Sequence, residues 1–169
     1  MKNLSKLLIG FFIIFVSGFT EAQYAPWAKL SSDAPKEINA RKYPVPSKTE
    51  VGIPAYPGAF ISSVSAPRQD TIEYKKEVLP FVILVSTDTP SKVISFYKKV
   101  LTKDKGWNYS EEYKTFVKGK IGSSLTGFVP SVAIRDDNGQ NFDLVYVDEG
   151  LKNGLKSRIE ITYKPENKE

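Results

Sequence analysis

Carboxylates are the first residues to consider for catalysis, because a pair at a fixed separation can hydrolyse a glycosidic bond by acid–base chemistry. Their scatter along this chain shows no catalytic spacing, and acids of this number are expected on any protein surface. A carboxylate-dependent hydrolase is therefore the weakest of three functional hypotheses. The carboxylates considered for that role are Asp70, Glu73, Asp143, Asp148 and Glu160.

Other catalytic side chains are missing, since the sequence contains no cysteine and no histidine. A disulfide framework, a thiolate nucleophile, a Cys/His zinc site and a Ser-His-Asp triad each require one of these residue types. All four are excluded, together with proton relays built on histidine. Side-chain chemistry is limited to carboxylate, lysine, tyrosine and hydroxyl groups.

Two short motifs resemble known signatures, but each has a simpler structural explanation. Ser95 and Lys98 match the Ser-x-x-Lys pair of penicillin-binding enzymes, yet the Lys-Thr-Gly partner motif is absent and Ser95 falls on the polar face of a helix. The residues from Asp136 onward resemble a calcium loop, but Val147 occupies the twelfth position, where an EF-hand has Glu. We predict no metal and no cofactor.

Aromatic side chains are the candidates for binding. Trp107, Tyr109 and Tyr113 alternate with polar residues, and lysines 114, 118 and 120 follow them. Such rings stack on sugars or pack on an envelope surface, although alternating aromatics on a strand also build cores. The candidate binding residues are Phe81, Tyr97, Trp107, Tyr109 and Tyr113.

Tyr97 belongs to the soluble helix that the sequence predicts, Pro90–Thr102. Pro90 suits the first helical position because its missing N–H would be unpaired there, and Asp88 or Thr89 provides the cap. Lysines dominate the outer face of this helix. Its inner face is an apolar stripe suited to packing on a sheet, formed by Val93, Tyr97, Val100 and Leu101.

Strands are predicted on both sides of this helix. Val78–Val85 is a nearly unbroken β-branched and aromatic run, typical of a buried central strand, and Pro80 is tolerable near its start. An Asn-Gly turn joins Val129–Arg135 to Asn141–Val147 as a hairpin. Arg158–Tyr163 closes the sheet. The other predicted strands are Phe60–Ala66, which Thr71–Tyr74 extends or follows as a second strand, and Trp107–Tyr113.

The order β-β-α-β-β-β-β predicts an α+β fold, in which one helix packs on a largely antiparallel curved sheet of about six strands. One helix covers only one face of such a sheet, yet Val78–Val85 is apolar on both faces. The second face therefore needs a cover. Four alternatives are open: curvature of the sheet, the 23–52 arm, a second copy of the chain in a homodimer, or a ligand.

Residues 1–22 have the pattern of a signal peptide. Two lysines precede the apolar run Leu7–Phe19, and small residues flank a cut after Ala22. At 1.5 Å per residue this run reaches about 20 Å, short of the roughly 30 Å hydrocarbon core. We expect a periplasmic or secreted protein with no membrane span after cleavage.

The remaining chain divides into an arm, a domain and a tail. Residues 23–52 are proline-rich and poor in large aliphatic side chains, so we predict a flexible linker or arm. A single domain follows over 53–165, and 166–169 form a disordered tail. The net charge of +5 arises from a mixture of acidic and basic residues rather than from a basic arm, so we predict no nucleic-acid partner.

The stretch from 56 to 107 carries a recurrent pattern. Tyr56-Pro57-Gly58-Ala59 forms a turn, Asp88-Thr89-Pro90 caps a helix with Val93 and Phe96-Tyr97, and Gly106-Trp107 starts the next strand. This pattern resembles that of small exported bacterial proteins of uncharacterised function. The resemblance implies the fold and the compartment, and it implies no activity or catalytic residue.

The first functional hypothesis is a non-catalytic periplasmic or secreted module that binds an envelope component, such as the cell wall, or a protein partner. The alternative is a small-ligand carrier whose pocket lies between helix and sheet and is lined by Phe81, Tyr97 and Trp107. The carboxylate-dependent hydrolase is the third.

Overall fold

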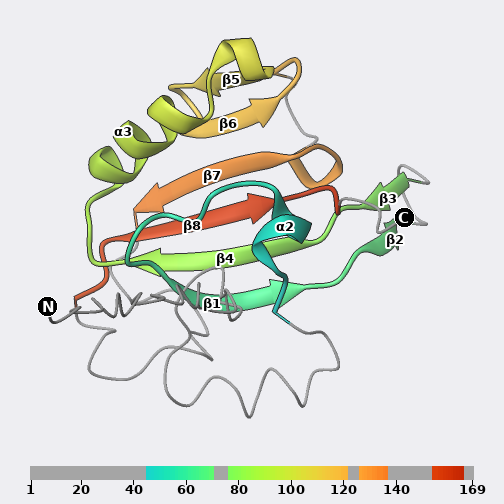
Figure 1. Cartoon of the computed structure of the whole chain (residues 1–169), viewed down its shortest axis with the longest axis horizontal. Coiled ribbons are helices and arrows are strands. Elements are labelled where there is room, and N and C mark those ends of the chain that lie inside the picture. The colour runs from blue at the N-terminus through green and yellow to red at the C-terminus, as the bar shows by residue number, and fades with distance from the viewer. Residues whose placement is uncertain (1–44, 71–75, 122–125, 137–153, 166–169) are drawn as a thin grey trace, which may run out of the picture.

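The protein has an α+β fold, shown in Figure 1 as a computed structural model that describes residues 45–70, 76–121, 126–136 and 154–165. One main helix, α3 (Pro90–Val100), packs on a curved antiparallel sheet. The strands of this sheet are β1 (Phe60–Ser65), β4 (Phe81–Ser86), β5 (Trp107–Ser110), β6 (Thr115–Lys118), β7 (Ser131–Asp136) and β8 (Ser157–Thr162).

The six strands lie in the order β1-β4-β8-β7-β6-β5, and every neighbouring pair is antiparallel. A separate two-stranded sheet pairs β2 (Arg68–Asp70) with β3 (Lys76–Val78). Three short helices complete the described elements: α2 (Lys48–Val51), η1 (Lys103–Lys105) and η2 (Thr126–Phe128). The predicted fold class is confirmed.

The run Val78–Val85, predicted as one strand, is divided between two sheets. β3 ends at Val78 and β4 begins at Phe81. Between them, the N–H of Leu79 donates to the carbonyl of Gly127 (2.8 Å), and the carbonyl of Pro80 accepts from the N–H of Tyr163 (3.1 Å). Because Pro80 has no N–H, it cannot continue a ladder on both sides, so the break falls there.

The prediction of one strand over Trp107–Tyr113 is wrong at its C-terminal end. β5 stops at Ser110, residues 111–114 form a turn, and the chain returns as β6, which the sequence analysis did not predict. Lys114 closes the turn with φ 47°, an unusual value for a side chain other than glycine. Tyr113 therefore lies in a hairpin turn instead of on a strand.

β8 occupies the middle of the sheet, whereas Arg158–Tyr163 was predicted only to close it. It pairs with β4 from Phe81 to Ser86 and with β7 from Ser131 to Asp136. Its inward side chains agree with the prediction, since Ile159, Ile161 and Tyr163 are all buried. β8 thus joins the N-terminal and C-terminal parts of the sheet.

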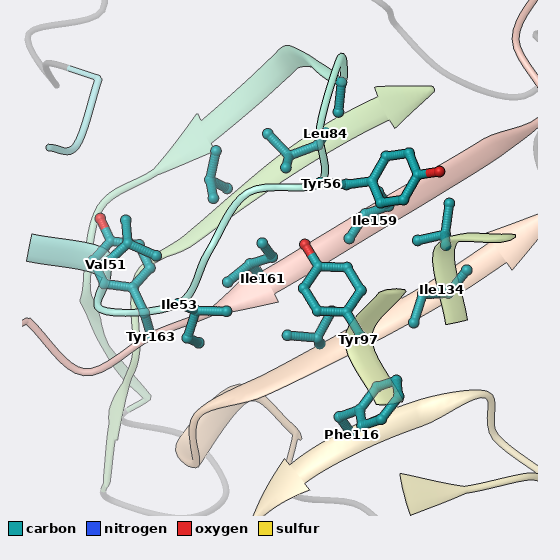
Figure 2. Packing of buried hydrophobic residues seen from close by; sticks show 14 of the residues in the cluster. Val51, Ile53, Tyr56, Leu84, Tyr97, Phe116, Ile134, Ile159, Ile161 and Tyr163 are labelled. Carbon is teal, nitrogen blue, oxygen red and sulfur yellow. The ribbon is translucent and has the colours of Figure 1, made fainter. Parts of the chain in front are cut away.

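The hydrophobic core lies between one face of the sheet and a layer made of α3 and residues 45–59. Figure 2 shows Tyr97 of α3 beside Phe116 of β6, with Tyr56 and Ile53 of the 45–59 segment over the central strands. Residues 45–52 had been predicted as part of a linker, yet Val51 is buried in this core and Val45 packs against it. The packed domain therefore begins before residue 53.

The second face of the sheet carries both apolar and charged side chains. Val85 is buried there against Leu155, with Phe60 beside them. On the neighbouring strand, Arg158 and Glu160 form an ion pair of 3.1 Å. The described part of the predicted arm, residues 45–52, packs on the α3 face and does not cover this one.

Several predictions fall on residues outside the described ranges: the signal peptide 1–22, residues 23–44 of the arm, the strands Thr71–Tyr74 and Asn141–Val147, and the tail 166–169. Within the described ranges, no helix combines the length and the apolar character needed to cross a bilayer.

Candidate functional site

A groove opens at one end of the six-stranded sheet, with a volume of about 460 Å³. We call it the Trp107 groove. Its lining is made of small and apolar residues and two lysines: Val51, Gly52, Ile53, Trp107, Lys118, Pro130, Lys164 and Pro165. The volume lies within the range of ligand sites in proteins.

Strand ends position the sheet side of the groove. Trp107 is the first residue of β5 and pairs with Lys118, the last residue of β6. Pro130 directly precedes β7, and Lys164 follows β8 by two residues. Because neighbouring strands in this sheet are antiparallel, the starts of β5 and β7 lie beside the ends of β6 and β8 at the same end of the sheet (Figure 1).

The indole of Trp107 is fixed by its flanking backbone. Gly106 ends η1 with φ 80°, a left-handed conformation that glycine adopts without strain, and the N–H of Trp107 donates to the carbonyl of Thr102 (3.1 Å). The next residue, Asn108, donates from its amide to the carbonyl of Gly119 (2.6 Å). Trp107 is 6% exposed and belongs to the core cluster, so little of its surface is open to the groove.

The opposite wall comes from α2, a helix of four residues that is held by its caps. The hydroxyl of Ser47 accepts from the N–H of Glu50 (3.2 Å), and the Glu50 carboxylate accepts from the N–H of Ser47 (3.4 Å). Gly52 ends the helix with φ 64°. This capping box and left-handed end turn the chain so that Val51 and Ile53 face the core and the groove together.

The groove carries positive charge on an apolar surface. Lys118 and Lys164 are exposed, and neither ammonium forms an ion pair with a described residue. None of the side chains lining the groove has a hydrogen-bond acceptor. The groove therefore favours a ligand that offers apolar surface and negative charge.

At the other end of the sheet a cluster of hydrogen bonds, which we call the Tyr56 clamp, fastens the 45–59 segment to the start of α3. The hydroxyl of Tyr56 donates to Asp88 (2.8 Å), and Lys92 donates to the other carboxylate oxygen (2.9 Å). Ser157 of β8 donates to the carbonyl of Asp88 (2.8 Å). Thr89 is the N-cap residue of α3 but makes no side-chain capping bond.

The clamp shifts the pKa values of its members. Burial of the ring, followed by the hydrogen bond to Asp88, raises the pKa of Tyr56 to about 12. The Lys92 ammonium, followed by the Tyr56 hydroxyl, lowers the pKa of the Asp88 carboxyl below its ordinary value. Both shifts keep the groups in the states that the hydrogen bonds require, a neutral phenol and an ionised carboxylate.

A smaller hollow of about 280 Å³ lies at the β5–β6 turn, between Tyr113 and Arg135. Its polar groups bond to one another: Arg135 donates to the carbonyl of Tyr113, and Lys114 forms an ion pair of 3.1 Å with Asp136. Tyr113 is 49% exposed there, and its hydrogen bond to Glu112 raises the pKa of its phenol. These contacts brace the hairpin.

Three of the five predicted binding residues come together in the core cluster. The ring of Tyr97 lies 6.1 Å from that of Phe116, and the ring of Tyr109 lies 4.5 Å from the same partner, while Trp107 is part of the same cluster. Tyr97 is fully buried and donates to the carbonyl of Pro54 (3.1 Å). These rings pack with one another, and only Trp107 reaches the groove.

Phe81 and Tyr113 lie apart from these three. Phe81 pairs with Thr162, one position from the pair of Val82 and Ile161, so it points to the sheet face opposite the core. The carrier pocket that was predicted from Phe81, Tyr97 and Trp107 is therefore not formed by these residues together.

The two motifs that resemble known signatures make structural contacts. The hydroxyl of Ser95 donates to the carbonyl of Ser91 (2.8 Å), and Lys98 lies 4.5 Å from the centre of the Tyr109 ring and 3.5 Å from Glu111. Asp136, at the start of the segment that resembles a calcium loop, pairs with Lys114. Among the described residues no three acidic side chains gather as metal ligands.

The candidate hydrolytic carboxylates are not brought together in the described part of the chain. Glu160 pairs with Arg158 on β8, and Asp70 ends β2 in the separate two-stranded sheet. Glu73, Asp143 and Asp148 lie outside the described ranges.

The sequence analysis missed most residues of the Trp107 groove. Val51, Gly52 and Ile53 were assigned to the linker or to its boundary, although Ser47 and Glu50 carry the Ser-x-x-Glu spacing of a capping box. That spacing, followed by Gly52, would have predicted α2. Lys164 gave no signal, because only the pairing of β8 brings it to the end of the sheet.

No protein-family model, no curated protein and no solved structure matches this chain. The residues and their geometry are therefore the basis for the function proposed below.

Proposed function

We propose that this chain is an exported, non-catalytic module that binds an envelope component or a protein partner in the Trp107 groove. The observation that carries the proposal is the composition of that groove: an apolar trough with two lysines that have no ion-pair partner among the described residues. Charges of this kind steer and hold an oppositely charged ligand, and the apolar wall supplies contact area.

The sequence supports the non-catalytic part of the proposal. The chain has no His or Cys, and its described polar clusters have structural partners: Asp88 is held by Tyr56 and Lys92, and Glu160 by Arg158. The signal-peptide pattern of residues 1–22 supports export.

Photo-crosslinking in the native envelope tests this proposal. A photoreactive benzoylphenylalanine replaces Pro165, which lines the groove, and in a control strain it replaces Lys99 on the outer face of α3. We expect one defined adduct from position 165 and none from position 99, and mass spectrometry identifies the occupant. Absence of an adduct at 165, or the same adducts at both positions, would contradict the proposal.

A small-ligand carrier is the second candidate, because a volume of about 460 Å³ also accommodates a small molecule. Native mass spectrometry of the gently purified protein distinguishes the two. A carrier retains a co-purifying small molecule of constant mass, whereas a binding module is measured as the bare chain.

A further inference from the structure

We propose that the ligand of the Trp107 groove is an extended acidic peptide segment, with an apolar side chain against Trp107 and carboxylates on Lys118 and Lys164. This inference rests on the proposed function, because it specifies the ligand of the same groove. It is argued from the residues of the groove and from the spacing of the strands that carry the lysines.

The separation of the lysines sets the spacing of the acids. Lys118 ends β6 and Lys164 follows β8, and only β7 lies between these two strands. Neighbouring strands are about 4.8 Å apart, so the backbones of β6 and β8 are separated by roughly 10 Å at this end of the sheet. An extended peptide advances roughly 3.3 Å per residue and places alternate side chains on one face. Acids two positions apart therefore lie roughly 7 Å apart on the same face, and the flexible lysine side chains cover the remaining distance.

The apolar lining favours a peptide over a glycan. Sugar hydroxyls require both hydrogen-bond donors and acceptors, yet the side chains of this groove offer no acceptor. A stacked sugar also requires an open aromatic face, and Trp107 is only 6% exposed. By contrast, Val51, Ile53 and Pro130 present the apolar contacts that hold an aliphatic side chain.

The charge of the groove is not neutralised within the described part of the chain. Lys118 and Lys164 contact none of the described acids. Lys99 and Lys103 also lack such a partner, so what distinguishes Lys118 and Lys164 is their place in the apolar lining of the groove. Two carboxylates of a ligand would complete these two pairs. A segment with a single acid or with basic residues would leave one or both unpaired.

A displayed library of random short peptides tests the inference, with the protein expressed from the full sequence and Trp27→Phe as the background. Because the chain has two tryptophans, this substitution leaves Trp107 as the sole indole and makes its fluorescence a reporter of the groove. We expect enrichment of peptides with two acids two positions apart beside an apolar residue. These peptides should change the Trp107 emission and lose affinity as salt concentration rises.

Charge reversal provides the matched comparison. In Lys118→Glu/Lys164→Glu the dissociation constant of the enriched peptides should rise about tenfold or more. Lys99→Glu/Lys103→Glu makes the same change in net charge on exposed residues that do not line the groove, and should leave the constant within about twofold. Thermal unfolding verifies that the variants fold, and Lys118→Gln/Lys164→Gln replaces the reversed pair if it does not fold.

Three outcomes would overturn the inference: no enrichment above the charge-reversed variant, enriched peptides without paired acids, or binding that survives charge reversal. Equal competition by polygalacturonate, an anionic glycan without apolar side chains, would overturn the choice of a peptide. These outcomes are separate from failure of the proposed function. A defined adduct at position 165 that proves to be neutral or non-peptidic would keep the binding module and remove the acidic peptide.

Discussion

Lysines lie at both ends of the sheet, but their surroundings differ. At the Tyr56 clamp, Tyr56, Asp88 and Lys92 bond to one another within a cluster. At the Trp107 groove, Lys118 and Lys164 stand on an apolar surface and have no acidic partner among the described residues. The charged groups of the clamp are paired within the protein, whereas the lysines of the groove are available to a ligand.

A single segment, residues 45–59, spans both ends. Val51 and Ile53 form a wall of the groove, Tyr56 reaches the clamp, and the carbonyl of Pro54 between them accepts from Tyr97. This contrast indicates that the clamp holds residues 45–59 in place, whereas the groove depends on them for one of its walls. Substitutions at the clamp should therefore lower stability, and charge substitutions at the groove should change binding alone.

The largest loss of stability is expected at Tyr97, because this side chain holds the segment that connects the clamp and the groove. Tyr97→Ala removes a fully buried ring and the hydrogen bond that holds Pro54, and should lower the free energy of unfolding by about 3–5 kcal/mol. Chemical denaturation measures this loss. Lys99→Ala on the exposed face of the same helix is the control and should change stability by less than about 0.5 kcal/mol. A small loss in Tyr97→Ala would mean that the two ends are held independently.

A smaller effect is expected at the clamp itself. Tyr56→Phe keeps the buried ring and removes the hydroxyl that donates to Asp88, so it should cost about 1 kcal/mol of stability. A double-mutant cycle with Asp88→Asn isolates the coupling between the two side chains. Peptide affinity of the groove should stay unchanged in both variants. Additive losses, or a change in affinity, would contradict the separation of roles.

The clamp should also respond to acid. Because Lys92 and Tyr56 lower the pKa of Asp88 in the folded state, folding favours its ionised form. Its contribution is fully present above the ordinary aspartate pKa of about 3.9 and is lost as the pH falls through the lower folded value. Denaturation from about pH 5 to about pH 3 should show a shrinking stability difference between the native chain and Asp88→Asn. A constant difference would show that Asp88 does not couple to folding.

The smallest effect on stability is expected at the groove. Lys118 and Lys164 are exposed and bond to no described side chain, so Lys118→Glu/Lys164→Glu should shift the unfolding free energy by less than about 0.5 kcal/mol. Thermal and chemical denaturation measure it. A larger loss would mean that these lysines stabilise the domain, and the contrast between the two ends would be weaker.

Sequence patterns predicted the fold wherever one local rule decided the structure. The stripe of α3, its Pro90 start and the alternation of Ile159 and Ile161 each follow from periodicity or from the geometry of one residue. Errors arose where a distant partner decided. Pro80 marks where the run Val78–Val85 is weak, but the split into two sheets also depends on distant partners: the N–H of Leu79 donates to Gly127, and the carbonyl of Pro80 accepts from Tyr163.

The candidate site was harder to predict than the fold. Trp107 lines the groove, but the sequence offered it only as one of five aromatics, most of which pack in the core or lie elsewhere. The groove is a junction of four strand ends and a short helix, so its members are far apart in sequence. The sequence does not distinguish Lys164 from other surface lysines, because its place in the groove follows from the position of β8 between β4 and β7.

The central position of β8 has a consequence for how the chain is made. β8 is the last described strand in the sequence, yet the β1–β4 pair and the β5–β6–β7 meander are joined through it in the sheet. A nascent chain that lacks Ser157–Thr162 holds two separate pieces of sheet, neither of which completes the core. Cooperative folding of the domain therefore waits until Ser157–Thr162 has been synthesised. Such a delay would suit the export proposed above, because a polypeptide that has not yet folded can be threaded through a narrow channel.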